Sequence, residues 1–124
     1  MKSIAIIGAF IAVLAGGIIY WGMSEDSGTV AALDPSKITY FYGAECPHCQ
    51  KVNAFLEENK IADKVTFEKL EVWHNRGNAR LMGEAAKACG LDESKVGVPF
   101  VYAEGKCLIG EPDTIDFFKQ KAGL

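Results

Sequence analysis

The sequence contains no run of lysine or arginine residues. Its 13 basic residues are scattered and are outnumbered by 16 acidic ones, for a formal net charge of -3. Nucleic-acid-binding proteins usually carry a basic patch, so the composition argues against that class. The chain also lacks internal repeats and low-complexity tracts, and 49% of its 124 residues are hydrophobic. These features indicate one compact domain with an appendage.

Charged side chains are absent from Ile4 to Met23. A helix of about 20 apolar residues spans the roughly 30 Å of a bilayer core, so residues 1–23 are predicted to form a transmembrane anchor. Lys2 before this segment and Glu25 after it favour a cytoplasmic N-terminus and an extracytoplasmic domain, in the periplasm or at the cell exterior. The alternative is a signal peptide cleaved near the small residues 30–32, although its apolar core would be unusually long.

The rest of the chain predicts a linker, residues 24–36, and one α/β domain, residues 37–124. A helix between the first two strands and a hairpin near the end indicate a mixed sheet with helices on both faces. The second strand is expected at an edge, because its alternation slips near Glu68. The predicted order is β-α-β-α-β-β-α, with strands at 37–42, 65–72, 100–104 and 106–109 and helices from the cysteine motif to about 59, at 78–89 and at 113–122.

Cys46 and Cys49 stand three residues apart at a strand-to-helix junction, where their sulfurs can reach bonding distance. Cys46 is predicted to be the nucleophile, because a helix N-terminus stabilises a thiolate. Pro47 suits the first helical turn, and His48 can add positive charge that favours the reduced form. Cys49, one turn inward, is predicted to resolve a mixed disulfide. The redox-active disulfide itself would carry the electrons, so no metal and no separate cofactor is predicted.

Other readings of the cysteines remain open. A zinc site would need ligands from Cys89, Cys107 or a histidine, none of which forms a second closely spaced pair. A purely structural bond between Cys46 and Cys49 would close little chain entropy. Cys89 and Cys107 could form a structural disulfide, remain buried free thiols or act as a second redox relay. His74, at the end of the second strand, is expected to be a solvated loop residue.

The combination of Cys46-Pro47-His48-Cys49 after a strand, Val98-Pro99 before a hairpin and Gly110 before the last helix resembles the thioredoxin and glutaredoxin superfamily. The resemblance covers about Lys37 to Leu124 and implies a minimal thioredoxin-like, or glutaredoxin-like, fold. It also implies that Pro99 is cis and lies opposite the nucleophilic sulfur, with the neighbouring backbone of Val98 holding an extended substrate. An ordinary trans proline that opens a strand is the alternative.

The chain departs from these families at informative positions. Glutaredoxins usually have threonine where Val98 stands and glycine where Glu111 stands, which leaves glutathione use open. Thioredoxins commonly bury a carboxylate at the position of Tyr40. The proton acceptor for the resolving cysteine is then water, Glu45 or a residue such as Glu68.

The predicted function is therefore a thiol-disulfide oxidoreductase that exchanges disulfides with extracytoplasmic protein thiols and leans towards oxidation. A glutaredoxin-like reductase, supplied with electrons by a membrane redox partner, is one alternative. A non-catalytic thioredoxin-like binding module is another. The protein is expected to act as a monomer attached to the membrane through its N-terminal helix.

Overall fold

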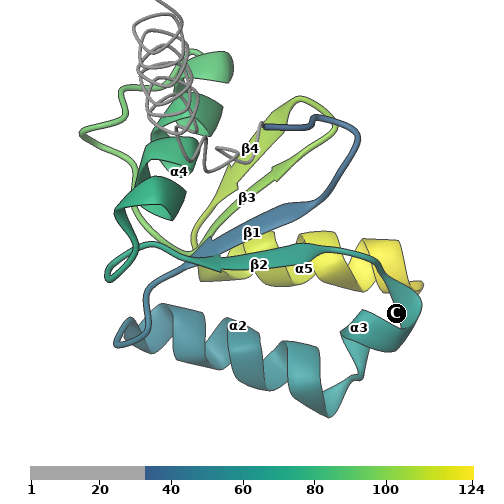
Figure 1. The fold of residues 1–124 in the computed structure, drawn as a ribbon. Coiled ribbons are helices and arrows are strands. Elements are labelled where there is room, and N and C mark those ends of the chain that lie inside the picture. The colour runs from purple at the N-terminus through teal and green to yellow at the C-terminus, as the bar shows by residue number, and fades with distance from the viewer. Residues whose placement is uncertain (1–32) are drawn as a thin grey trace, which may run out of the picture. The chain divides into compact units, whose positions relative to one another are not determined.

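The computed structural model of the protein describes residues 33–124, which form four strands and four helices (Figure 1). The predicted anchor, residues 1–23, lies outside the described residues. Within residues 33–124, no helix is long and apolar enough to cross a membrane. In chain order the elements are β1 (Thr39–Tyr42), α2 (Pro47–Glu58), α3 (Ile61–Lys64), β2 (Glu68–Glu71), α4 (Arg76–Ala88), β3 (Phe100–Ala103), β4 (Lys106–Ile109) and α5 (Glu111–Ala122).

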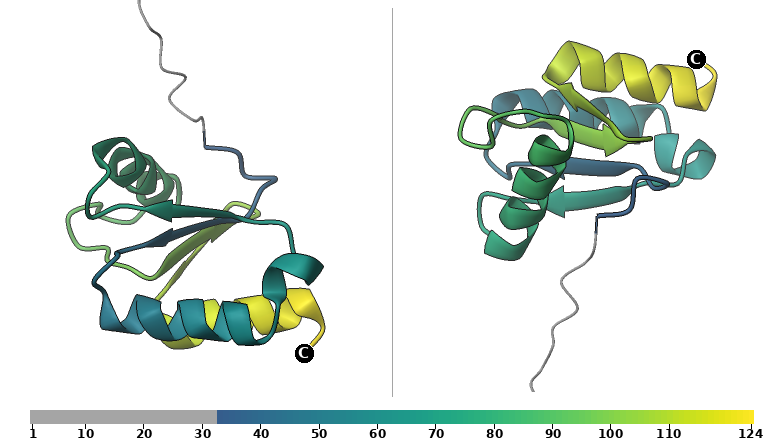
Figure 2. Two further views of the ribbon diagram at one scale, coloured as in Figure 1. Left: turned by 60° about the horizontal axis from the view of Figure 1, so that its bottom comes forward. Right: turned by 90° about the horizontal axis from the view of Figure 1, so that it is seen from above.

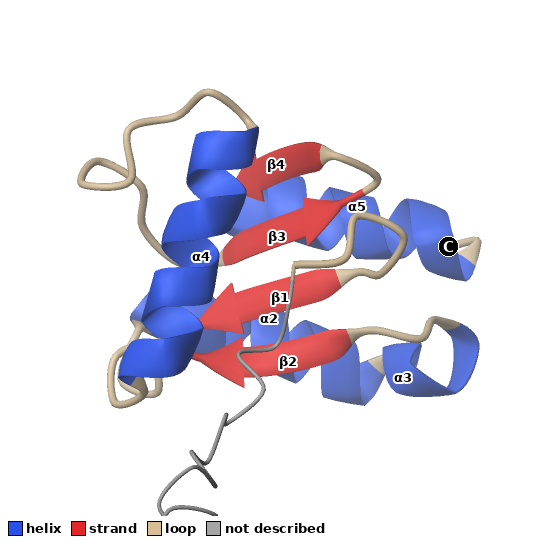
Figure 3. Cartoon of the chain, turned by 45° about the horizontal axis from the view of Figure 1, so that its top comes forward, coloured by secondary structure: helices blue, strands red, loops and turns tan. Residues whose placement is uncertain are grey.

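The strands form one mixed sheet in the order β2-β1-β3-β4 (Figure 3). β1 pairs in parallel with β2 and antiparallel with β3, and β3 and β4 form a hairpin. α4 covers one face of the sheet, while α2, α3 and α5 cover the other (Figures 1 and 2). The predictions of an α/β domain, a mixed sheet covered on both faces and an edge position for the second strand are therefore confirmed.

The two central strands are buried on both faces because their side chains alternate between two hydrophobic clusters. Tyr40 of β1 pairs with Val101 of β3, and both side chains belong to the cluster beneath α2, α3 and α5. Phe41 pairs with Phe100, and both belong to the cluster beneath α4. The almost continuous apolar sequence of these strands thus serves two separate helix-sheet interfaces.

The sequence did not predict α3, and this helix shortens the second strand. α3 is a single turn that follows Lys60, whose φ of 49° is left-handed. Ile61 at its start and Val65 just after its end bury their side chains in the cluster beneath α2, α3 and α5. The strand predicted from residue 65 therefore begins at Glu68. A four-residue helix is too short to show helical periodicity.

The last two helices begin two residues earlier than predicted. Asn75 caps α4, since its side-chain oxygen accepts a hydrogen bond from the backbone of Asn78 at 3.0 Å. Asparagine is among the best capping residues, so this signal was present in the sequence. α5 starts directly after Gly110 and carries Pro112 in its first turn, where a missing N–H costs nothing.

The end of the predicted linker contacts the domain. The carbonyl of Pro35 accepts a hydrogen bond from the backbone of Glu104 at 2.9 Å, in the turn between β3 and β4. Leu33 packs against the cluster beneath α4. These contacts attach the chain just before β1 to the face of the sheet that α4 covers.

Cys89 and Cys107 form a disulfide, the first of the three arrangements that the sequence left open. Cys89 is the C-cap of α4, and Cys107 lies on β4, 18 residues further along the chain. β4 is an edge strand and α4 packs on the sheet beside it (Figure 3). The bond therefore fixes the end of a helix to the outermost strand.

Replacing Cys89 and Cys107 together by serine is expected to lower the free energy of unfolding by about 3 kcal/mol, since a bond that closes a loop of this length restricts the unfolded chain by that amount. Guanidinium unfolding followed by circular dichroism measures the loss. Both proteins should carry Cys46→Ser and Cys49→Ser so that thiols cannot exchange. An unchanged midpoint would show that the bond contributes no stability.

Candidate active site

One end of each of the four strands lies at the same end of the sheet. Tyr42 of β1 is level with Glu71 of β2, Phe41 pairs with Phe100 at the start of β3, and Phe100 pairs with Ile109 at the end of β4. The loops that leave or enter these positions therefore meet. They carry the cysteine motif, the Val98-Pro99 bond and the start of α5, so the topology brings together residues more than 50 positions apart.

Cys46 is the N-cap of α2. Its backbone is extended, with φ -74° and ψ 117°, and Pro47 occupies the first helical turn. Its sulfur accepts a hydrogen bond from the backbone N–H of Cys49 at 3.2 Å. The sulfur thus takes the place of the oxygen that usually caps a helix, where unpaired N–H groups and the positive end of the helix dipole favour negative charge.

Cys49 has a different environment from Cys46, although both are free thiols in this structure. Cys49 is fully buried, whereas 4% of the Cys46 surface is exposed to solvent. Burial is the largest of the causes that raise the pKa of Cys49, followed by its hydrogen bond with Cys46. A backbone hydrogen bond from Gly43 and the hydroxyl of Tyr40 act in the opposite direction but do not outweigh burial. Cys49 is therefore held as a thiol.

The Val98-Pro99 peptide bond lies beside Cys46 and is cis. The thiol of Cys46 donates a hydrogen bond to the carbonyl oxygen of Val98, with sulfur and oxygen 3.8 Å apart. A pocket opens next to this contact. Its lining comes from α2, the loop before β3 and the start of α5, and consists of His48, Val98, Pro99, Gly110, Glu111 and Pro112.

His48 faces α5. Its Nδ1 atom lies 2.9 Å from a carboxylate oxygen of Glu111, and Lys51 lies 3.9 Å from the same oxygen. The Glu111 side chain is only 23% exposed, whereas that of His48 is 68% exposed. The imidazole was expected to act on the Cys46 sulfur, but its partner in the structure is this carboxylate across the pocket. The sequence drew attention to Glu111 only as a replacement for glycine, so its pairing with His48 is a new feature.

The opposite side of the cysteine loop packs against the loop after β2. A Cβ atom added to Gly43 would come within 2.5 Å of two ring carbons of Trp73, so the tryptophan needs glycine at this position. Half of the Trp73 surface remains exposed. This close packing places a large aromatic side chain beside the segment that leads to Cys46, a contact for which the sequence offered no signal beyond the proximity of both residues to strand ends.

Glu71 joins these two loops by hydrogen bonds. Its carboxylate accepts one from the backbone of Ala44 at 2.7 Å and another from the backbone of His74 at 2.6 Å. Desolvation is the largest single influence on Glu71 and raises its pKa, but the N–H groups of His74 and Ala44 and the charge of His74 together lower that pKa on balance. The ionised carboxylate therefore holds the cysteine loop against the loop after β2.

His74 was expected to be an unremarkable solvated loop residue. It is exposed, but its Nε2 atom lies 2.7 Å from a carboxylate oxygen of Glu45, the residue before Cys46. The hydrogen bond and charge of Glu45 raise the pKa of His74, and Glu71 contributes in the same direction. A histidine-carboxylate pair therefore lies on each side of the cysteine motif.

The predicted site residues Cys46, Pro47, His48, Cys49, Val98 and Pro99 thus lie together, while the Cys89–Cys107 disulfide belongs to α4 and β4. In the part of the chain that the structure describes, no three histidine, cysteine or carboxylate side chains gather as metal ligands. Comparison with protein-family models found no match to the chain, and a search of curated proteins also found none. The function must therefore be argued from the geometry of the site.

Glu45→Gln is expected to lower the pKa of His74 towards its ordinary value of 6.5, because the variant removes the main cause of the rise. A raised folded-state pKa stabilises the fold while the histidine is protonated. The difference in stability between parent and variant should therefore be present below about pH 6.5 and should disappear as the pH rises through the folded-state pKa. Titration of the His74 ring by NMR measures the shift, and His48 in the same spectra is the control. Identical titration curves for parent and variant would contradict the pairing.

Proposed function

We propose that the protein is a thiol-disulfide oxidoreductase with a thioredoxin-like fold, in which Cys46 attacks and Cys49 resolves. The observation that carries the proposal is the asymmetry of the two cysteines. Both side chains are buried, but one sulfur sits at a helix N-terminus and accepts a backbone N–H, while the other is held as a thiol. The first environment favours a nucleophilic thiolate, and the second keeps Cys49 protonated until a mixed disulfide forms on the neighbouring sulfur.

The reaction follows from this arrangement. The Cys46 thiolate attacks a substrate disulfide, one substrate sulfur leaves as a thiolate, and a mixed disulfide remains on Cys46. Cys49 then loses its proton and attacks the Cys46 sulfur, which releases the second substrate thiolate and leaves a Cys46–Cys49 disulfide. In the opposite direction, a substrate thiolate attacks Cys46 and Cys49 departs. The same two sulfurs can therefore oxidise or reduce a client.

The pocket beside Cys46 suits an extended peptide. The carbonyl of Val98 already bonds to the Cys46 thiol, so the backbone at this position lies within reach of a chain that is covalently attached to that sulfur. Extended peptides are commonly held by such exposed backbone groups. We therefore propose protein thiols and disulfides as the substrates, with the Val98 backbone aligning the segment on either side of the reacting cysteine.

Two features favour an extracytoplasmic oxidant. The Cys89–Cys107 disulfide is of a kind that persists in oxidising compartments, in keeping with an anchor that would place the domain outside the cytoplasm. The helix N-terminus at Cys46 favours the thiolate and therefore the reduced form, which makes the disulfide a stronger oxidant. The reductase fed by a membrane partner and the non-catalytic binding module remain the competing functions.

Cys49→Ser is expected to trap a mixed disulfide with a test peptide disulfide. Without the resolving thiol beside it, that bond should live at least about 10³-fold longer than in the parent protein, given the high effective concentration of a neighbouring group. Mass spectrometry measures the amount of this mixed disulfide over time. Cys46→Ser, the matched control, should form none. If Cys49→Ser gives no adduct with any peptide or protein disulfide tested, the non-catalytic binding module becomes the better explanation.

The reduction potential of the Cys46–Cys49 pair is expected to lie above about -150 mV, with the oxidising catalysts. Equilibration in glutathione buffers, followed by mass spectrometry of the peptide that contains both cysteines, measures it while the Cys89–Cys107 bond stays intact. A value below about -250 mV would instead identify a reductant supplied by an electron carrier.

A further inference from the structure

The pair of His48 and Glu111 lies at the pocket beside Cys46. His48 is in the first turn of α2 and Glu111 is the first residue of α5, and these two helices cover the same face of the sheet (Figure 2). The Nδ1 atom of the imidazole is 2.9 Å from a carboxylate oxygen of Glu111. Both residues line the pocket together with Val98, whose carbonyl oxygen accepts the hydrogen bond from the Cys46 thiol. The pair therefore lies beside the sulfur that reacts with a client.

The carboxylate determines which imidazole nitrogen carries the hydrogen. An ionised carboxylate only accepts hydrogen bonds, so Nδ1 of His48 is the donor in this contact. The other nitrogen, Nε2, makes no hydrogen bond with any group in residues 33–124. It can accept a proton when the ring is neutral and donate one when the ring is protonated. An imidazole oriented in this way by a carboxylate is suited to general acid–base catalysis.

The carboxylate is the fixed member of the pair. The side chain of Glu111 is 23% exposed, and it lies in the first turn of α5, where the positive end of the helix dipole favours negative charge. The ammonium of Lys51, also on α2, lies 3.9 Å from the same carboxylate oxygen. The other lining residues, among them Val98 and Pro99, carry no charged side chain. The charged groups around the His48 ring are therefore Glu111 and Lys51.

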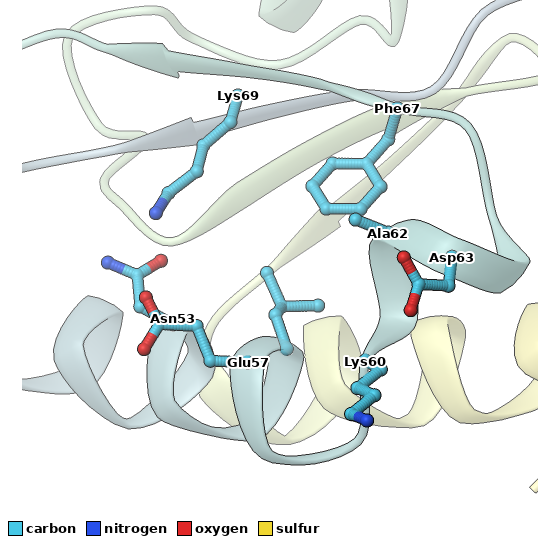
Figure 4. Close-up of a pocket in the computed structure, with 8 residues that line it drawn as sticks. Asn53, Glu57, Lys60, Ala62, Asp63, Phe67 and Lys69 are labelled. Atoms are coloured by element: carbon cyan, nitrogen blue, oxygen red, sulfur yellow. The ribbon is translucent and has the colours of Figure 1, made fainter.

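No second pair of this kind faces the pocket in the part of the chain that the structure describes. The Nε2 atom of His74 is 2.7 and 2.9 Å from the two carboxylate oxygens of Glu45, and neither residue lines the pocket beside Cys46. Another pocket, between α2, α3 and β2, is lined by Glu57 and Lys69 among others but by no histidine or cysteine (Figure 4). An acid–base group and the reacting sulfur thus come together at the pocket between α2 and α5.

We propose that His48 transfers the proton of the client's sulfur and that Glu111 positions it for this step. The inference rests on the proposed function and specifies its first step. As the Cys46 thiolate attacks a client disulfide, the bond from Cys46 to one client sulfur forms and the client S–S bond breaks. The leaving sulfur keeps the electron pair of that bond and takes a proton from Nε2 of the imidazolium. In the opposite direction, neutral Nε2 takes the S–H proton of a client thiol whose sulfur attacks Cys46, and Cys49 leaves with the electron pair.

This role defines the class of client sulfur that benefits. An ordinary cysteine has a pKa of about 8.5, so at neutral pH its thiol is mostly protonated and its thiolate readily takes a proton. Proton transfer by His48 helps such a sulfur both to leave and to attack. A sulfur whose thiolate is already stable at neutral pH gains nothing from it. The clients are therefore proteins with ordinary cysteines rather than activated ones, and the two kinds of sulfur provide a test.

His48→Ala tests the inference in the full-length protein that also carries Cys49→Ser, so that formation of the mixed disulfide is the only step. Attack is compared on a dialkyl peptide disulfide and on a nitroaryl disulfide, whose leaving thiolate needs no proton. We expect the ratio of the alkyl rate to the aryl rate to fall about tenfold, the lower end of what a general acid contributes to a fair leaving group. A change in the amount of Cys46 thiolate alters both rates alike, so the ratio isolates the proton transfer. Rapid-quench mass spectrometry measures both rates.

Glu111→Gln should lower the same ratio about threefold, because the imidazole remains but is no longer oriented. The amide of glutamine can donate to Nδ1, so the ¹⁵N NMR shifts of the His48 ring should move towards the form that carries its hydrogen on Nε2. The ring of His74 is the control in these spectra. Asp113→Asn is the matched control for the rates, since Asp113 is also a carboxylate in the first turn of α5 but lines a different pocket. It should leave the ratio unchanged.

Three results separate the inference from the proposed function. An unchanged ratio in His48→Ala, whether both rates fall together or neither falls, would overturn the proton-transfer role of His48. Parent ¹⁵N shifts of the His48 ring in Glu111→Gln would overturn the positioning role of Glu111. Absence of an adduct with either disulfide in Cys49→Ser alone would instead overturn the proposed function itself.

Discussion

The site depends on one hydrogen bond, from the backbone N–H of Cys49 to the sulfur of Cys46. It exists because the first cysteine takes the capping position of α2 and the second lies three residues into the helix, where the N–H groups have no partner within the helix. The same geometry buries the Cys49 side chain against the sheet. One helix start therefore makes two identical side chains chemically different, and the rest of the fold serves to hold that start in place.

The sheet holds the start of α2 from two sides. On one side, Glu71 at the end of β2 fixes the loop before Cys46, and Trp73 fills the space that a side chain at position 43 would need. On the other side, β3 and α5 begin beside the motif and bring Val98 and Glu111 to it. Because the helix start is fixed on both sides, the fold sets the position of the Cys46 sulfur.

Periodicity and motif spacing were enough to predict a mixed sheet, the edge position of its second strand and the order of all elements except α3. They could not predict which side chains meet across loops. The pairing of His48 with Glu111 joins residues 63 positions apart, and His74 meets Glu45 across 29 positions. Such contacts depend on the end of the sheet at which the four strand ends meet. Single side chains at that end leave no periodic signal in the sequence. The hydrogen bond from Tyr40 to Asn53 also leaves no such signal, because it joins a strand to a helix face.

The chain's two cysteine pairs differ because the two ends of a helix carry partial charges of opposite sign. Cys46 lies at the N-terminus of α2, where the helix dipole and the N–H groups of the first turn favour negative charge. Cys89 is the C-cap of α4, where the negative end of the dipole disfavours a thiolate. A thiolate-destabilising position resists reduction, and the 18-residue separation of Cys89 and Cys107 adds stability that the short Cys46–Cys49 loop cannot. The positions of Cys46 and Cys89 at opposite kinds of helix end thus distinguish the pair to which exchange is assigned in the proposal from the disulfide that joins α4 to β4.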